Sequence, residues 1–244
     1  MRLIRTIALA LLSAVIASAI VYFAVVRPRV RTWGVDPGEE DLHLPGDDLI
    51  AEPSHTETRG IDIAAPPDKV WPWLVQMGFG RAGWYSYDAM DMKGSSASSI
   101  VPEFQALEVG DVVPTHPGGG FQVKVIEPER ALVLFTDTEL VKAQAEQAQA
   151  SGTDELPTPG LKVSGAMMSA SYPEFSASWA FFLQPNGQDG TRLIERFRAK
   201  TPGSGPASAV LGEIMGTGIV LMTRKQMLGI KERVEQPALE PVAV

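Results

Sequence analysis

The sequence contains no cysteine and only three histidines. Without cysteine there is no disulfide, no thiolate nucleophile and no cysteine-ligated metal site. The histidines, His43, His55 and His116, do not stand at a spacing typical of metal ligands, so we expect no zinc site. The triple glycine at 118–120 lacks the GK[ST] of a phosphate-binding loop and predicts a hairpin turn. We therefore expect neither a metal nor another cofactor.

Basic residues are also scarce beyond the first part of the chain. Residues 1–31 carry five arginines and no acid, whereas the remainder has 16 basic and 29 acidic residues. Because an acidic domain repels phosphate backbones, nucleic acid is not an expected partner. The early arginines are instead typical of the flanks of a membrane segment.

Residues 7–26 form one long run of 20 uncharged, mostly apolar residues. A helix of this length spans roughly 30 Å, the thickness of a bilayer core. A cleaved signal peptide is the alternative, because Ala17-Ser18-Ala19 has the A-x-A form. The run continues past that motif to Val26, which favours an uncleaved anchor over residues 1–31 and a single-pass protein of the cell membrane. Arginines at both ends leave the side of the soluble domain open, and nothing indicates the oligomeric state.

Residues 32–55 are acidic and contain three prolines. This composition predicts a solvated, mostly irregular linker, in which only Trp33 and Leu44 are candidates to dock on a domain.

Residues 56–235 have the pattern of one α+β domain. The double proline at 66–67 opens a short helix, and the apolar run at 208–234 predicts a long one. Residues 139–162, helix-prone at 140–150, look like an insertion, and 236–244 form a tail. Expected strands are 56–64, 109–114, 120–127, 131–136, 174–184 and 191–200. This order predicts a curved antiparallel sheet wrapped around the C-terminal helix, with an apolar cavity between them.

The segment IDIAAPPDKVWPWLVQMG carries a resemblance to a known superfamily. With IVPEFQALEVGDVV, SWAFFLQPNGQDGTRLIERFRAK and the ending TRKQMLGIKERVE, it resembles the START/polyketide-cyclase-like helix-grip superfamily, or SRPBCC. The loop GRAGWYSYD is similar to that of an N-terminally membrane-anchored branch. The resemblance implies a helix-grip fold and a hydrophobic ligand or a cyclase or dehydratase activity. A ring-oxygenase domain is excluded, because the iron ligands and the cysteine-rich cluster domain are missing.

Aromatic residues make up only 7% of the chain, yet five tryptophans and tyrosines fall between positions 71 and 87. Such side chains build either a ligand pocket or an ordinary core, and methionine adapts to both. As candidate ligand-binding residues we take Trp73, Met77, Trp84, Tyr85, Tyr87, Phe104, Trp179, Phe181, Met215 and Met222.

Glu195 is the main candidate for acid–base chemistry. It shares a strand face with Leu193 and Phe197, and burial would raise its pKa. An enzyme would pair it with Tyr85 or Tyr87 in catalysis, whereas a salt-bridged Glu195 would be structural. His116, in a turn, is expected to be exposed.

The leading hypothesis is a membrane-tethered binding domain for a lipid, isoprenoid or polyketide-like molecule. The alternatives are a cyclase- or dehydratase-type enzyme and a non-catalytic protein-interaction domain.

Overall fold

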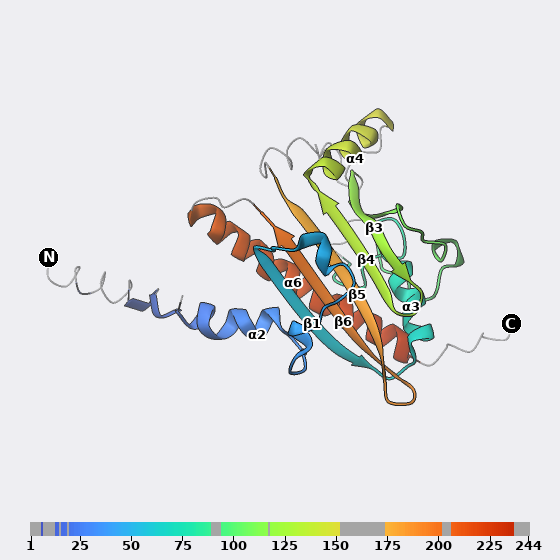
Figure 1. Cartoon of the computed structure of the whole chain (residues 1–244), viewed down its shortest axis with the longest axis horizontal. Coiled ribbons are helices and arrows are strands. Elements are labelled where there is room, and N and C mark those ends of the chain that lie inside the picture. The colour runs from blue at the N-terminus through green and yellow to red at the C-terminus, as the bar shows by residue number, and fades with distance from the viewer. Residues whose placement is uncertain are drawn as a thin grey trace.

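The computed structural model describes residues 6, 13–14, 16–18, 20–88, 94–116, 118–151, 174–201 and 206–236, with only the backbone for 206–219. Its centre is one antiparallel sheet of six strands in the order β1-β6-β5-β4-β3-β2 (Figure 1). The strands are β1 (His55–Ile63), β2 (Val112–His116), β3 (Gly119–Glu127), β4 (Ala131–Asp137), β5 (Ser176–Asn186) and β6 (Gly190–Lys200). The predicted α+β class is confirmed, as is the hairpin turn between β2 and β3.

Two helices, α3 (Pro67–Val75) and α6 (Pro206–Glu235), pack on one face of the sheet, here called the inner face (Figure 1). Helix α3 begins after Pro66 and ends three residues beyond Pro72, which has no amide hydrogen to donate. The last turn of α6 is fixed to β1: Lys231 Nζ donates to the Asp62 carbonyl at 2.7 Å, and Glu235 Oε1 accepts from the Ala64 amide at 2.6 Å. Helix α6 therefore runs in the same direction as β1.

The pairing register sorts the side chains of the sheet onto two faces. Trp179 lies opposite Phe197, Phe181 opposite Glu195, and Leu183 opposite Leu193, so all of these share the inner face. The arginines of β6 alternate with them and point to the outer face, as the sequence pattern predicted for that strand.

The part of the outer face formed by β5 and β6 is covered by residues 33–54, here called the strap. Leu44, Asp47 and Ile50 are 1%, 6% and 3% exposed. The strap contains two short 3₁₀ turns, η2 (Glu39–Asp41) and η3 (Asp47–Ile50), and η3 packs on β5 and β6. This segment is mostly irregular, as predicted, but it is not solvated along its whole length, because Glu39 and Asp47 pair with arginines on β6. Docking of Trp33 and Leu44 is confirmed.

Before the strap, a π-helical turn, η1 (Tyr22–Val26), continues into α2 (Arg27–Arg31). Within the described parts of the chain, no helix is long and apolar enough to cross a membrane. The predicted anchor, residues 7–26, is described only in part. Helix α4 (Thr138–Ser151) packs on β3 and β4 and forms the first part of the predicted insertion. Residues 152–173 and the tail from 237 lie outside the described residues.

Candidate functional site

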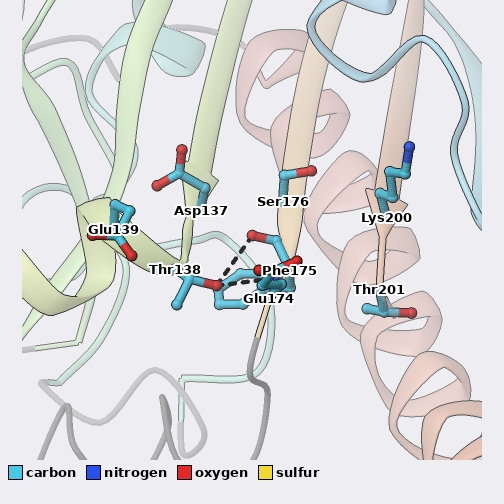
Figure 2. Close-up of a pocket in the computed structure, with 8 residues that line it drawn as sticks. All are labelled: Asp137, Thr138, Glu139, Glu174, Phe175, Ser176, Lys200 and Thr201. Atoms are coloured by element: carbon cyan, nitrogen blue, oxygen red, sulfur yellow. Dashed lines mark hydrogen bonds between the residues drawn. The ribbon is translucent and has the colours of Figure 1, made fainter. Parts of the chain in front are cut away.

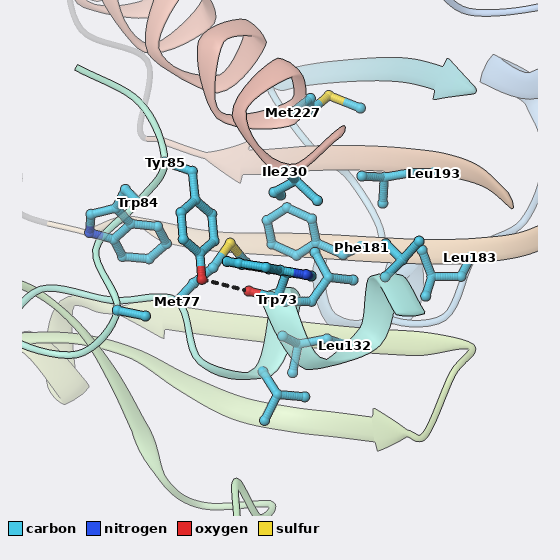
Figure 3. Close-up of a cluster of buried hydrophobic side chains, with 14 of the residues drawn as sticks. Trp73, Met77, Trp84, Tyr85, Leu132, Phe181, Leu183, Leu193, Met227 and Ile230 are labelled. Carbon is cyan, nitrogen blue, oxygen red and sulfur yellow. Dashed lines mark hydrogen bonds between the residues drawn. The ribbon is translucent and has the colours of Figure 1, made fainter. Parts of the chain in front are cut away.

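One half of the inner face is a closed hydrophobic core between the sheet, α3 and α6 (Figure 3). Met77 and Tyr85 are 1% exposed and Phe181 is 0% exposed, so none of them faces a water-sized space. Trp73 and Trp84 are buried in the same cluster. The structure thus places five of the candidate ligand-binding residues in core packing, and their contact with a ligand stays a prediction.

The other half, here called the open half, keeps accessible surface on the same face. Phe121, Trp179, Phe197 and Ala199 are only partly buried, although each points to the helix side of the sheet. The indoles of Trp84 and Trp179 stack with centroids 5.3 Å apart, and the Phe121 ring meets Trp179 edge-on at 5.9 Å. Aromatic walls of this kind suit an apolar ligand.

The outermost row of the open half has a floor of small side chains. The register aligns His55, Ala199, Ala177 and Thr136 across β1, β6, β5 and β4. The two residues in the middle of the row, Ala199 and Ala177, carry only methyl groups. Thr136 Oγ1 is buried and has no hydrogen-bond partner among the described residues. A buried hydroxyl without a partner is costly, so this atom is a candidate contact for a polar group of a ligand.

A charged cluster lies beside this floor, formed by Glu57 and Arg59 on β1 and Glu195 on β6. Arg59 donates through Nη1 to Glu195 Oε2 at 2.7 Å and through Nη2 to Glu57. Trp179 Nε1 donates to Glu195 Oε1 at 2.6 Å, and His55 Nε2 lies 2.8 Å from Glu57 Oε1. Arg59 and Glu195 are both 0% exposed. Because burying charges is costly, this cluster is a candidate for a functional role as well as a structural one.

The two carboxyl groups of the cluster differ in acidity. Complete burial raises the pKa of Glu195 above its ordinary value, against the opposing effect of Arg59. Burial acts in the same direction on Glu57, but the hydrogen bond with His55 and the charge of Arg59 outweigh it and lower the pKa of Glu57. A proton taken up by the cluster therefore resides on Glu195 rather than on Glu57.

The hydroxyl of Tyr85, proposed as a partner of Glu195, makes its hydrogen bonds with other groups. Its hydroxyl accepts from Gln76 Nε2 at 2.8 Å and donates to the Trp73 carbonyl at 3.2 Å (Figure 3). Burial raises the pKa of Tyr85 to about 12. Its φ of +56° is strained for a residue other than glycine, and a side chain at Gly229 of α6 would collide with its carbonyl. Through these contacts Tyr85 holds its loop against α3 and α6, which is a structural role.

The remaining candidates are scattered over the structure. Tyr87 is 45% exposed, so neither tyrosine meets Glu195 in a hydrogen bond. Phe104 lies in the turn η4 (Pro102–Phe104), under the guanidinium of Arg81 at 5.0 Å. Met222 is partly buried, and its carbonyl accepts a hydrogen bond from Ser86. The Met215 side chain lies outside the described residues.

The sequence reasoning missed His55, Glu57, Arg59 and Thr136. The available signal was the alternation of His55, Glu57 and Arg59, which puts three charged or polar side chains on one face of β1.

The prediction that His116 is exposed was wrong. It is partly buried beside β3, accepts from the Gly118 amide at 3.0 Å, and has its pKa lowered by burial.

A hollow of about 410 Å³ opens at the ends of β4, β5 and β6 (Figure 2). Thr138 bonds to the backbone of Phe175 there, and the acids Asp137, Glu139 and Glu174 share the hollow with Lys200. Among the described residues no group of three acids or histidines is arranged to hold a metal ion. None of the described residues that line the hollow has a buried polar atom without a hydrogen-bond partner, and we assign no role to the hollow.

Comparisons with known proteins find only distant likenesses. No protein-family profile and no curated protein match the chain. A solved protein from Arthrobacter aurescens is similar with a TM-score of 0.42 and 13% identity, over 76% of this chain and 90% of its own. A hypothetical protein from Helicobacter pylori gives 0.43 and 9%, over 80% and 96%. A protein from Mesorhizobium loti gives 0.36 and 14%, over 76% and 100%. Since all three TM-scores lie below 0.5, the fold assignment rests on this chain's own sheet topology.

Proposed function

We propose that this chain binds a hydrophobic small molecule in the open half of the inner face, between the sheet and the amino-terminal half of α6. One observation carries the proposal: Phe121, Trp179 and Phe197 keep accessible surface on a face whose other half is closed. An aromatic wall over a floor of two alanines suits an apolar body, and the Thr136 hydroxyl suits one polar group.

The position of α6 supports this placement. Lys231 is bonded to Asp62, and twelve residues of helix before it span about 18 Å. Five residues of β1 before Asp62 span about 17 Å and reach Glu57. The backbone of α6 from residue 219 toward its start therefore passes the charged cluster and the alanine floor. Helix and sheet together enclose the proposed site.

The finer family and membrane assignments belong to the same proposal. The sheet order and the C-terminal helix are consistent with the helix-grip superfamily that the sequence resembles. Residues 7–26 are proposed as a membrane anchor, on the strength of their length and apolarity. A hydrophobic ligand dissolves in the bilayer, so a tethered binding domain would work close to its supply.

Catalysis of the cyclase or dehydratase type has weaker support. It needs a second acid or base facing Glu195, but Tyr85 is occupied by Gln76 and Trp73, and Tyr87 lies at the surface. Both Glu195 oxygens already accept hydrogen bonds, from Arg59 and Trp179. Binding requires no further group, and for that reason it is the function proposed.

The test is native mass spectrometry of a chain that begins at residue 32 and is purified without detergent. We expect a discrete co-purifying mass that organic extraction removes. Ala199→Leu fills the floor and should abolish the extra mass, whereas Ala143→Leu, on the exposed side of α4, should leave it. A clean apo mass that persists with a panel of lipids would overturn the binding proposal and favour a protein-interaction domain.

A further inference from the structure

The connection between helix α2 and the strap is very short. Helix α2 ends at Arg31, and the Trp33 carbonyl already accepts from the Gly60 amide of β1 at 3.1 Å. The guanidinium of Arg224, on α6, lies over the Trp33 indole at 5.0 Å. Only Thr32 separates the end of the helix from the first residue held by the sheet, and α2 itself contacts β1 and α6.

Arg192 is the first clamp on the strap. It donates to both carboxylate oxygens of Glu39, through Nε at 2.8 Å and Nη2 at 2.7 Å, and also to the Gly34 carbonyl at 2.5 Å. Burial acts to raise the pKa of Glu39, but the hydrogen bonds from Arg192 and the Asp36 amide outweigh it and lower that pKa. A two-pronged pair of this kind fixes geometry as well as charge.

Arg196 is the second clamp, and all five of its N–H groups are used. Nε donates to Thr58 Oγ1, and the two Nη atoms donate to the carbonyls of residues 39, 40 and 42 and to Asp47 Oδ2 at 2.8 Å. Asp47 also pairs with Arg198 at 3.0 Å and accepts from the Leu44 amide at 2.9 Å. The strap is thus bonded to β6 along its length, through side chains that are nearly all buried.

The clamps decide how far the domain can stand from a preceding helix. A free segment of 24 residues has a root-mean-square span of about 27 Å and reaches roughly 80 Å when extended. Here the connection is a single residue, so the position of the domain follows the position of α2. The domain cannot swing or withdraw unless the contacts of Trp33 with Gly60 and Arg224 break, and the arginine clamps then limit how much of the strap can follow.

The fold shows on which side of the domain α2 and the open half lie. In Figure 1 the described turn η1 and helix α2 extend from the sheet toward the same side as the amino-terminal end of α6. That end of α6 lies over the open half, because the helix runs parallel to β1 and its last turn is bonded to the far end of that strand. The open half and the preceding helix therefore lie toward one side of the domain.

We propose that the strap is a rigid mount that turns the open half of the inner face toward the bilayer crossed by the anchor. The partner surface is the lipid bilayer that holds residues 7–26, and the same bilayer is the source of the ligand. Arg27, Arg29 and Arg31 lie between anchor and sheet, where they face anionic headgroups. This inference rests on the proposed anchor and binding site, and it adds the orientation and the lipid source.

Orientation is measured on the full chain in vesicles of phosphatidylcholine with a tenth of phosphatidylglycerol. Because the chain has no cysteine, single labels can be placed at will, as Thr56→Cys at the near end of β1 and Asp189→Cys in the far β5–β6 turn. Energy transfer to an acceptor on the lipid headgroups should be stronger from position 56 than from 189. Equal transfer from both, or a chain that fails to float with the vesicles, would overturn the mount.

The strap is tested by an insertion that leaves every clamp intact. Twelve Gly-Ser residues after Thr32 should lower transfer from position 56 by roughly half and abolish its excess over 189. The same insertion after Gly187, an exposed turn, should leave transfer from 56 unchanged. If the first insertion has no effect, the strap does not set the orientation. None of these readouts needs a ligand, so loss of the co-purifying mass with orientation retained would overturn the binding site alone.

Discussion

At the scale of single residues, Arg59 supplies the positive charge of the buried cluster, because it is the arginine bonded to both Glu57 and Glu195. Replacing it by methionine leaves two buried carboxylates without their counter-charge. We expect Arg59→Met to lower the free energy of unfolding by about 3–5 kcal/mol at pH 7.5, as measured by urea denaturation.

The same variant should recover part of its stability at pH 5. Without Arg59 the carboxyl pKa values rise in the folded state, so the folded protein binds more protons than the unfolded chain and gains stability as the pH falls. Arg130→Met, which breaks an exposed pair with Glu127, is the matched control and should behave as wild type. Equal stability of Arg59→Met and wild type at pH 7.5 would mean that Glu57 and Glu195 do not depend on Arg59 as their counter-charge.

Tyr85 offers a second test, at alkaline pH. Its pKa is about 12 in the folded state, against 10.0 ordinarily, so the folded protein keeps a proton that the unfolded chain loses. Stability must therefore fall as the pH rises from about 10 to 12, by up to roughly 2–3 kcal/mol. Tyr85→Phe should remove this slope while losing about 1–2 kcal/mol at pH 7, where Gln76 is left with one partner fewer. A slope unchanged in the variant would mean that another group titrates.

The sequence could place these residues on strands and loops, but it could not decide their partners. Alternation put Glu195 on one face of β6 with Leu193 and Phe197, and this is what the register shows. It could not choose the buried face, because both faces of that strand carry charges. That choice depends on Arg59, 136 residues earlier in the chain, and such a pairing leaves no local signal.

At the scale of elements, β5, β6 and α6 were predictable because long runs with one period leave little freedom. The predicted strand 191–200 and helix 208–234 differ from the observed elements by no more than two residues at each end. The strap was not predictable in this way. Its acidic, proline-containing composition is typical of a solvated linker, and its order comes from arginines on a distant strand rather than from its own periodicity.

Asp47 tests whether the strap belongs to the fold. Asp47→Asn removes the charge that faces Arg196 and Arg198 and weakens the bond to the Leu44 amide, so we expect a loss of about 2–4 kcal/mol in the free energy of unfolding. Asp48→Asn changes the same net charge at a side chain that faces solvent, and it should unfold at the same urea concentration as wild type. If the two variants behaved alike, the clamp would contribute nothing to the fold.

At the scale of the whole molecule, the inner face divides into two parts. The closed half stabilises the fold, and the open half is available to bind a ligand. Core packing of Phe181, Leu193 and Ile230 closes one end, and the strap covers the outer face of β5 and β6. The open half bears buried charge, partly accessible aromatic rings and the Thr136 hydroxyl, which has no hydrogen-bond partner within the described part of the chain. A molecule with this division can lose or gain a ligand without disturbing the contacts that hold sheet and helix together.

Hydrogen exchange should display the division directly. Amides at Phe181 and Leu193 on the sheet and at Met227 and Ile230 on α6 should exchange only through global unfolding, because they surround the closed core. Amides of α6 before residue 220 should exchange faster, since that half covers the open site. Addition of the co-purifying ligand to stripped protein should slow exchange in that half and at Ala199, while the closed half stays unchanged. Protection that spread evenly over both halves would mean that the ligand acts on the fold as a whole, and the division into core and site would have to be abandoned.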